Sequence, residues 1–322
     1  MKRYIISIIA FLSAILCNAQ LTEKSSIVYF TKEISPDALL KIYRSLGVEP
    51  QGKVAIKIST GESAETSYLR PQFIKPLILE TDGTIVECNT AYQGNRNTTE
   101  KHLEAIAERG FLDVATVDIM DADGAMKIPV TDTIHIKYDI VGDHLANYDF
   151  MVNLAHFKGH ASGGYGGVLK NASIGVASSN GKIYIHSAGA SDSVWSKGPQ
   201  DHFLESMAAA AQAVHNYMNS KDENDKPHVV YINVMNNLSV DCDCNAHPEA
   251  PKMKDIGIAA SLDPVALDRA CLDMVFNHNS SEGDDASALI ERINSRHGTH
   301  TVDYAESIGL GTQKYKLVEL DK

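Results

Sequence analysis

Short apolar segments alternate with helix-forming segments along most of the chain, and this alternation constrains the fold more than any other feature. Helix starts, each marked by a capping side chain or a proline at the first helical position, lie near Ser35, Thr98, Asp201 and Asp263. Strands that alternate with helices need crossover connections, so we expect an α/β fold with a mostly parallel sheet and helices on both faces, built as one body or as two lobes around a cleft. The candidate strands are 27–30, 53–59, 84–89, 115–120, 150–156, 228–235 and 255–260.

The first residues have the pattern of an export signal. Two basic residues precede an apolar core that ends at Leu16, and small residues allow cleavage after Ala19. The core is shorter than the roughly 20 residues that cross a bilayer, and no later apolar run reaches that length. We therefore expect residues 1–19 to be a cleaved signal peptide and 20–322 to form the α/β domain. The protein would then be periplasmic or secreted and would have no transmembrane segment.

Charge and cysteine content exclude several classes of protein. The formal net charge is −12, and loss of the two positive charges of Lys2 and Arg3 with the signal moves it to −14. An acidic chain is a poor match for nucleic acid or an anionic membrane surface. The cysteines that remain are too few for a disulfide scaffold in a chain of this length, so a hydrophobic core must stabilise the fold. They are Cys88, Cys242, Cys244 and Cys271.

The segment 153–175, NLAHFKGHASGGYGGVLKNASIG, concentrates chemical groups directly after an apolar strand. Ligands of α/β sheets gather where strands end, and glycines let backbone N–H groups approach an anion while lysines add positive charge. Neither a Walker loop nor a Rossmann fingerprint is present, and a solvated glycine-rich loop is the alternative to a site. The predicted catalytic residues are His156, His160, Lys170 and Asn171, and the predicted cofactor-binding residues of this segment are Lys158, Gly164, Gly166 and Gly167.

Cys242 and Cys244 are two residues apart in VDCDC, so in extended backbone both thiols point to one face and suit one soft metal ion. We therefore predict a divalent transition metal at this pair. The alternative is that an oxidising compartment pairs either cysteine with Cys88 or Cys271. A metal would need further ligands, because a complete site usually has four. The candidates are His247, His156, His160 and His186.

Two charged residues outside these segments are further candidates. Arg96 follows the strand that ends near Cys88, and its guanidinium offers a fork that suits a carboxylate or a phosphate of a cofactor. Asp268 lies about one turn into the helix that begins near Asp263, and we expect it to pair with a lysine of the site. Asp263 itself is explained by helix capping.

The chain resembles a domain-of-unknown-function family numbered 362, whose members are often called uncharacterised iron-sulfur-centre proteins. Many members carry a ferredoxin module with four-cysteine runs before the helix that begins near Asp201. Here that place holds only AGASDSVWSKGPQ, without a cysteine, so an iron-sulfur cluster of ferredoxin type is not expected. The resemblance rests on CNTAYQGNRNTTEKHLEAIAERGF at 88–111, DADG at 121–124, HFKGHASGGYGGVLKNASIG at 156–175, KIYIHSA at 182–188, DCDC at 241–244 and DIGIAASLDPVALDRACLD at 255–273.

A weaker likeness links the same central segment to lactate racemases that tether a nickel-pincer nucleotide to a lysine. His160, the glycines of 163–167, Lys170 and Gly175 are similar to the His, Gly-Gly, Lys and Gly pattern of those enzymes, with a spacing that differs by one residue. The likeness implies that Lys170 either attaches a cofactor covalently or pairs with an anion.

These observations predict an exported enzyme that depends on a metal or a metal-bearing cofactor and acts on a small anionic substrate. In this interpretation a histidine transfers protons and Lys170 holds the anion. The alternative is a periplasmic binding protein that captures a metal ion or a small anion without chemistry. Both interpretations predict a small anion or a metal ion as the partner and exclude nucleic acid.

Overall fold

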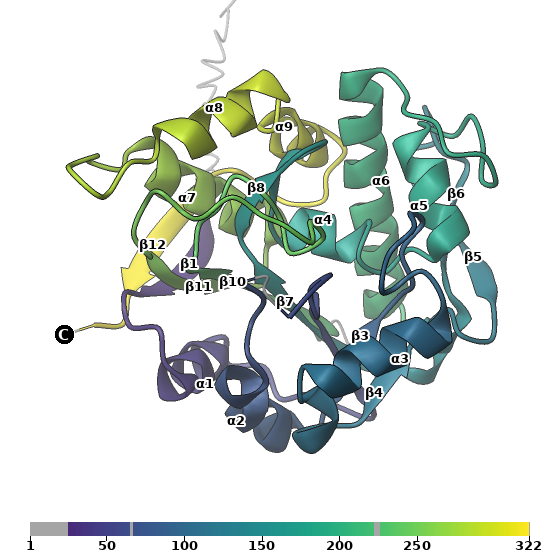
Figure 1. Ribbon diagram of the computed structural model, residues 1–322, viewed down its shortest axis with the longest axis horizontal. Helices are drawn as coiled ribbons and strands as arrows, with labels where there is room; N and C mark the ends of the chain where they lie inside the picture. The colour runs from purple at the N-terminus through teal and green to yellow at the C-terminus, as the bar shows by residue number, and fades with distance from the viewer. Residues whose placement is uncertain (1–24, 65–66, 222–225, 322) are drawn as a thin grey trace, which may run out of the picture.

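One eight-stranded sheet runs through the residues described by a computed structural model of the chain, which are 25–64, 67–221 and 226–321. The predicted signal peptide lies outside the described residues. The strand order is β12-β1-β11-β10-β7-β2-β3-β4 (Figure 1). The strands are β1 (Ser26–Thr31), β2 (Val54–Lys57), β3 (Thr84–Glu87), β4 (Val117–Ile119), β7 (Phe150–His156), β10 (Val229–Met235), β11 (Gly257–Ser261) and β12 (Tyr315–Glu319).

The sheet is mostly parallel. Every neighbouring pair from β10 through β7, β2 and β3 to β4 is parallel, and so is the pair of β1 with β12. Only β11 runs against its neighbours β1 and β10. The predicted α/β fold with a mostly parallel sheet is therefore confirmed. The eight strands form one continuous sheet in the described part of the chain.

Two small antiparallel sheets lie outside the main sheet and were not predicted from the sequence. The first pairs β5 (Ala125–Pro129) with β6 (Tyr138–Gly142), and the second pairs β8 (Lys158–His160) with β9 (Gly164–Gly166). Because β8 begins directly after β7, the β8–β9 hairpin projects from the carboxyl end of the main sheet. The glycine-rich segment therefore folds as a hairpin followed by a helix and not as an open loop.

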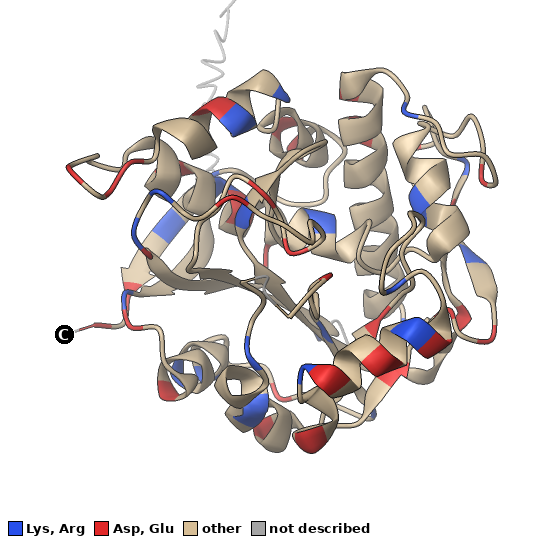
Figure 2. Cartoon of the chain, viewed as in Figure 1, with Lys and Arg blue, Asp and Glu red and all other residues tan. Residues whose placement is uncertain are grey.

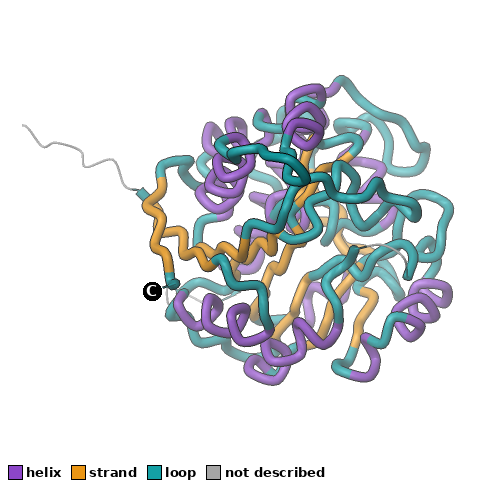
Figure 3. Tube along the Cα trace, turned by 60° about the vertical axis from the view of Figure 1, so that its left-hand side comes forward, coloured by secondary structure: helices purple, strands orange, loops and turns teal. Residues whose placement is uncertain are grey.

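Helices cover both faces of the sheet, as predicted (Figures 1 and 3). Two short 3-10 turns, at Phe111–Asp113 and Asp143–Asn147, complete the described elements. One face is covered by α1 (Pro36–Ser45), α2 (Pro71–Thr81) and α3 (Thr99–Glu108). The other face is covered by α4 (Val168–Ala172), α5 (Ser179–His186), α6 (Gln200–Asn219), α7 (Pro264–Phe276), α8 (Ser287–Ser295) and α9 (His300–Ser307).

A separate hydrophobic core fills the space on each side of the sheet. In β7, Phe150, Val152 and Leu154 join the core under α1 and α2, whereas Met151 and Ala155 join the core under α6 and α7. Adjacent residues of a strand point to opposite faces, so a strand covered on both sides reads as a continuous apolar run. Each buried Phe, Val, Leu or Met side chain of this kind contributes about 1.5–3 kcal/mol to the stability of the fold. Charged residues lie mainly on the outer helices and loops (Figure 2).

The helix starts follow from local capping. The side chain of Ser35 accepts the Ala38 N–H at the start of α1, and Asp263 accepts two N–H groups at the start of α7, so its predicted capping role is confirmed. An N-cap of this kind contributes about 0.5–2 kcal/mol. Among the described residues, no helix combines the length and the apolar character that a membrane span requires.

Candidate functional site

A cavity of about 290 Å³ opens at the carboxyl edge of the parallel strands. Its walls come from the ends of β2, β3 and β7, from the β8–β9 hairpin, from α4 and α5, and from the loop after β10. This is the position where ligands of α/β sheets bind. The structure brings together most of the predicted site residues there, from segments far apart in the sequence: Arg96, His156, Lys158, His160, Gly166, Gly167, Lys170, Asn171, Cys242 and Cys244.

The close approach of two backbone segments places the cysteines beside the hairpin. The N–H of Gly159, in the middle of β8, donates to the Ser239 carbonyl at 2.8 Å. A Cβ at position 159 would lie 2.3 Å from the Val240 carbonyl oxygen, a distance that real Cβ atoms do not reach. Glycine is required here because it has no side chain. The loop after β10 can therefore lie against β8 and present both cysteines to His160.

His160 is held in one tautomer by the hairpin turn. Its Nδ1 accepts the N–H of Gly163 at 2.8 Å and that of Ser162 at 3.3 Å. The proton of the neutral ring must therefore lie on Nε2. Burial, together with the charges of Lys170 and His186, lowers the pKa of His160 well below 6.5. The ring is neutral at physiological pH and offers Nε2–H as a hydrogen-bond donor.

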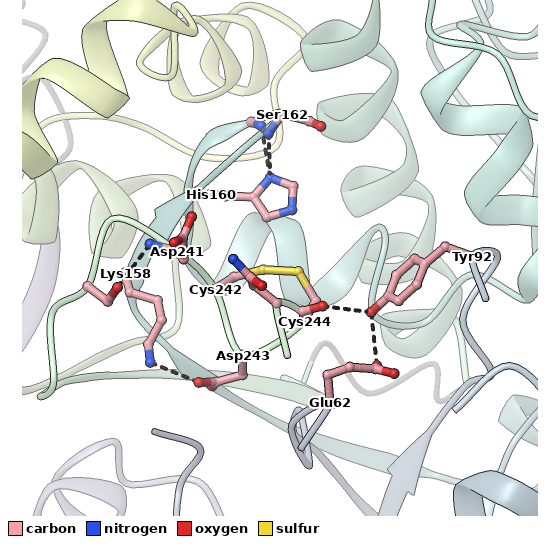
Figure 4. The surroundings of a disulfide bond; sticks show 12 residues. Glu62, Tyr92, Lys158, His160, Ser162, Asp241, Cys242, Asp243 and Cys244 are labelled. Atoms are coloured by element: carbon pink, nitrogen blue, oxygen red, sulfur yellow. Dashed lines mark hydrogen bonds and ion pairs between the residues drawn. A yellow bond between two sulfur atoms is a disulfide. The ribbon is translucent and has the colours of Figure 1, made fainter. Parts of the chain in front are cut away.

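Cys242 and Cys244 form a disulfide with each other, on the side of the other ring nitrogen of His160 (Figure 4). The predicted alternative partners, Cys88 and Cys271, are buried free thiols. A disulfide has no thiolate, so the oxidised pair does not provide the metal site predicted from its spacing. One ligand atom from each cysteine and one from His160 lie within 4.8 Å of one another. Metal binding by the cysteines stays a prediction for the reduced form.

Asp243, between the two cysteines, binds two of the predicted site residues. One carboxylate oxygen accepts Lys158 Nζ and the other lies against His156 Nδ1, both at 2.8 Å. Burial alone would raise the pKa of Asp243, but the contacts with these two partners outweigh it and hold the pKa far below 3.8. The His156 Nε2 lies 2.8 Å from the Asn236 carbonyl, so both ring nitrogens face acceptors. His156 is therefore a positioning residue and not the proton acceptor that its predicted catalytic role requires.

Two further cations of the cavity are also matched by buried acids. Lys57 Nζ lies 3.0 Å from Glu87, and Arg96 lies 3.0 Å from Glu62 and 3.3 Å from Glu87. Burial alone would raise the pKa of Glu87, but Lys57 and Arg96 lower it to about 2. The guanidinium of Arg96, which we predicted to bind a cofactor, is engaged by the protein's own carboxylates.

Lys170 differs from the other cations because its Nζ has no hydrogen bond or ion pair to any residue in the described part of the chain. It stands on α4 and points toward Gly166, where an added Cβ would lie 3.2 Å from its Cδ. Burial, with the positive charges of Lys57 and Arg96, lowers the pKa of Lys170 from 10.5 to about 8. The amine would be stabilised either by an anion or by loss of its proton.

His186, at the end of α5, has the tautomer opposite to that of His160. Its Nδ1 lies 2.7 Å from the Lys182 carbonyl, so Nδ1 carries the proton and Nε2 keeps a lone pair. Burial lowers the pKa of His186 to about 4, and the ring lies between Phe203 and Trp195 with centroid distances of 4.7 and 4.8 Å. The described residues give Nε2 no hydrogen-bond partner. It therefore offers a proton acceptor or a metal ligand to the cavity.

Comparison with known proteins identifies the family of the chain. The family described as Domain of unknown function (DUF362) matches residues 54–273, which is more than half of the sequence. The chain belongs to this family. No curated protein matches the sequence of this DUF362 member.

Two solved structures are distantly similar to the chain. The lactate racemase apoprotein from Thermoanaerobacterium thermosaccharolyticum is 12% identical with a TM-score of 0.44, over 77% of this chain and 56% of that one. A protein from Thermotoga maritima is 10% identical with a TM-score of 0.43, over 71% of this chain and 55% of that one. The DUF362 chain thus spans little more than half the length of either protein.

The predicted cofactor-binding glycines have different roles in this DUF362 protein. Gly166 and Gly167 line the cavity, whereas Gly164 does not belong to the lining that the structure describes. Gly164 has a φ of +81°, and a Cβ there would lie 2.9 Å from the Cα of Gly298. The prediction for Gly164 is corrected accordingly, because a hairpin turn and close packing explain this glycine.

Asp268 caps α4 and does not pair with a site lysine, which corrects our expectation. Its carboxylate accepts the N–H groups of Val168 and Leu169 at 3.0 and 3.1 Å, and also the side chains of Asn233 and Tyr165. Burial raises the pKa of Asp268 to about 6, although these donors act in the opposite direction. The first N–H groups of α4 are therefore already satisfied, and they are not the anion donors that the glycine-rich sequence indicated.

Asn171 connects α4 to the sheet. Its Nδ2 donates to the Lys57 carbonyl at 3.0 Å and to the Asn153 side chain at 2.7 Å, so its amide donors are used by the protein. A positioning role replaces the predicted catalytic one. His247, a predicted further ligand of the cysteine site, is exposed and lies outside the group formed by His160 and the cysteines.

Sequence reasoning missed the three acids that organise the cavity, Glu62, Glu87 and Asp243. Each is less than 6% exposed, and a buried carboxylate must find a cation or several N–H donors. The one signal in the sequence was the position of Glu87 at the end of the apolar strand TIVE. Such a residue is as often solvated as buried, so its pairing became visible only in the fold.

Proposed function

We propose that the cavity is the active site of an enzyme that binds a small anionic molecule through Lys170. The observation that supports this most strongly is a difference between neighbouring cations. Lys57, Arg96 and Lys158 each contact a buried carboxylate, whereas the Lys170 amine has no partner in the described residues. A partly buried cation without a protein partner is unfavourable, and a carboxylate or phosphate of a ligand in the cavity would supply a charge-assisted hydrogen bond.

Because their tautomers are opposite, His160 supplies a hydrogen-bond donor and His186 supplies a proton acceptor. The Nε2–H of His160 donates a hydrogen bond to an oxygen that gains negative charge, while the free Nε2 of His186 accepts a proton. Both rings line the same cavity as Lys170. We therefore propose proton transfer on a small carboxylic acid or phosphate as the reaction class. His160 and His186 replace the predicted pair of His156 and His160.

A more specific version of the proposal adds a transition metal or a metal-bearing cofactor to the site. Of the two histidines, His186 fits a metal because its Nε2 carries a lone pair, whereas the Nε2 of His160 carries a proton. In this form of the proposal His186 would hold the metal and would not accept the proton. A metal bound there would act as a Lewis acid. The amine of Lys170 would hold the anionic part of a cofactor, either as an ion pair or through a covalent bond.

We also propose that the protein is exported and that its signal is cleaved after Ala19. The basic start and the apolar core within residues 1–19 support export, and a disulfide such as Cys242–Cys244 suits an oxidising compartment. Cell fractionation with N-terminal sequencing of the mature protein tests this. Full-length protein in the cytosol would contradict it.

The reactivity of Lys170 tests the central proposal. Mass spectrometry of the native protein first shows whether this lysine already carries a group. Unmodified protein is then treated with pyridoxal 5′-phosphate, an anionic aldehyde, reduced with borohydride and digested for peptide mapping. At pH 8 an amine with a pKa of about 8 is about half neutral, whereas an ordinary lysine is less than 1% neutral. We expect Lys170 to react first and inorganic phosphate to protect it.

Two variants make this labelling experiment specific. Lys170→Arg keeps the positive charge and should remove the dominant labelled peptide. Lys75→Arg changes an exposed lysine of α2 and should leave the pattern unchanged. If Lys170 reacts no faster than Lys75, and phosphate has no effect on either, the anion site is not there.

A further inference from the structure

We propose that the Cys242–Cys244 disulfide is a redox-active couple in the wall of the cavity, which exchanges with a small dithiol while His160 stabilises the thiolate that is released. The observations that carry this are the position of the disulfide, the short ring that it closes, and the fixed N–H of His160. The inference goes beyond anion binding at Lys170 and does not depend on it.

The disulfide contributes little as a structural cross-link. It joins residues separated by only two positions, and the stabilisation from a disulfide rises with the length of the closed loop. Other contacts already fix the same loop. The Glu62 N–H donates to the Asp243 carbonyl at 2.7 Å, and Arg292 donates to the Val240 carbonyl at 2.8 Å. The loop is therefore expected to stay in place when the disulfide opens.

The disulfide is open to small molecules but not to the other thiols of the described chain. Cys242 and Cys244 both line the cavity, and Cys244 is the more exposed of the two, since Cys242 is 9% exposed. Cys88 and Cys271 are buried as free thiols, and burial raises the pKa of Cys88 to about 12. A thiol that attacks the pair must therefore come through the cavity, which favours a small reductant.

The N–H of His160 is aimed at the sulfur atoms by the backbone. Because Nδ1 accepts the Gly163 N–H at 2.8 Å, Nε2 keeps its proton, and Figure 4 shows this nitrogen on the side of the disulfide. A hydrogen bond to a thiolate stabilises the charged form. The same tautomer disfavours a metal held by His160 and both cysteines, since Nε2 would have to lose its proton while Nδ1 still accepts one.

The acids beside the cysteines do not oppose thiolate formation, because each is neutralised by a cation. Asp241 pairs with Arg292 at 3.2 Å, and Asp243 pairs with Lys158 at 2.8 Å. An isolated aspartate next to a cysteine would repel the thiolate. Because both aspartates are paired, neither places an uncompensated negative charge beside the sulfur atoms.

The exchange takes two steps. A thiolate of the dithiol attacks Sγ of Cys244, forms a mixed disulfide and releases Cys242 as a thiolate beside His160. The second thiol of the reductant then attacks its own sulfur in the mixed disulfide, releases Cys244 and leaves the reductant as a cyclic disulfide. Two electrons and two protons pass from the dithiol to the cysteine pair, and an oxidised dithiol reverses both steps.

The test uses the full folded protein in buffers of reduced and oxidised dithiothreitol, followed by alkylation with iodoacetamide and peptide mass spectrometry. We expect reversible reduction of Cys242 and Cys244 without denaturant, an unchanged circular dichroism spectrum, and no alkylation of Cys88. His160→Ala should slow reduction about tenfold, the scale of one charge-assisted hydrogen bond. His160→Gln retains an N–H donor and should restore much of the rate.

The matched control is His247→Ala, which removes an exposed histidine close to Cys244 in the sequence and should keep the rate of the unchanged protein. A pair that opens only in denaturant is a buried cross-link, and that result would overturn the proposal. Equal rates for folded His160→Ala and His247→Ala would overturn the role of His160.

Discussion

The Nζ of Lys158 lies 2.8 Å from a carboxylate oxygen of Asp243, and this pair ties the β8–β9 hairpin to the loop that carries both cysteines. Both side chains are less than 6% exposed, and the second oxygen of Asp243 contacts His156. His156 and Lys158, two residues apart, thus share one buried carboxylate that comes from a distant segment of the chain. The geometry of the cavity depends on this contact as much as on any group that would face a ligand.

Replacing Asp243 should therefore destabilise the protein strongly. Asp243→Asn removes the charge that Lys158 and His156 share, and breaking a buried ion pair from one side costs about 3–5 kcal/mol. Urea unfolding of the unchanged protein and of the variant measures the difference. Glu282→Gln, which removes an exposed acid, is the control and should change the free energy of unfolding by less than about 0.5 kcal/mol. Similar unfolding midpoints for the two variants would show that Asp243 is dispensable.

The stability of the protein should fall with pH in the acidic range. The pKa of Glu87 is about 2 in the folded state and about 4.5 when unperturbed, so the unfolded chain binds the proton more readily. This contribution is fully present above about pH 4.5 and is lost as the pH falls toward 2. Urea midpoints between pH 6 and 3 measure the decline. Glu87→Gln should give a shallower slope, and an unchanged slope would mean that Glu87 does not titrate as the structure indicates.

Lys170 should lower stability at neutral pH. Its folded pKa of about 8 lies below the ordinary 10.5, so the unfolded chain holds its proton more tightly and stability rises as the pH increases from about 8 to 10.5. Lys170→Met removes the unpaired charge and should raise the free energy of unfolding at pH 7 by about 1–3 kcal/mol while abolishing this rise. Thermal unfolding at pH 7 and pH 9 measures both effects. A destabilised variant at pH 7 would mean that the amine has a partner within the folded protein.

Metal content separates the candidate ligands. In protein purified without chelator, the metal-dependent form of the proposal predicts near-stoichiometric transition metal, measured by plasma mass spectrometry. His186→Ala should lose most of it, because the lone pair of Nε2 is removed. A Cys242→Ser, Cys244→Ser double variant tests whether the reduced cysteines are ligands. Metal at background level in the unchanged protein would eliminate the metal-dependent form.

Proton exchange distinguishes an enzyme from a binding protein. A panel of small carboxylic acids is incubated with the protein in D₂O, and exchange of carbon-bound protons is followed by NMR. We expect exchange for at least one acid and its loss in His186→Gln, since the amide cannot accept a proton as the imidazole does. Binding that depends on Lys170 without exchange of any acid would favour the non-catalytic alternative.

The sheet and the helix starts could be predicted from the sequence because both are encoded locally. The apolar composition of Phe150–His156 by itself indicates a buried strand. Ser35 and Asp263 cap the helices that follow them. The strand β12 was missed because half-exposed and exposed residues dominate it, so it lacks an apolar signal.

The sequence indicated which polar residues belong to the site but not what each of them does, because their roles depend on contacts between distant segments. Arg96 and His156 have the right chemistry for a ligand, but Glu62, Glu87 and the Asn236 carbonyl engage them. The difference between His160 and His186 lies in which ring nitrogen meets the backbone. A sequence alone does not show that difference, because tautomers are set by hydrogen bonds.

Gly159 has a consequence for anyone who redesigns this protein. The residue contributes no functional group, yet even a methyl group at its position would push the Val240 peptide away and carry the sulfur atoms with it. The cysteines can lie beside β8 and His160 only because residue 159 has no Cβ atom. A search for important positions that considers only acids, bases and nucleophiles would overlook the residue on which their meeting depends.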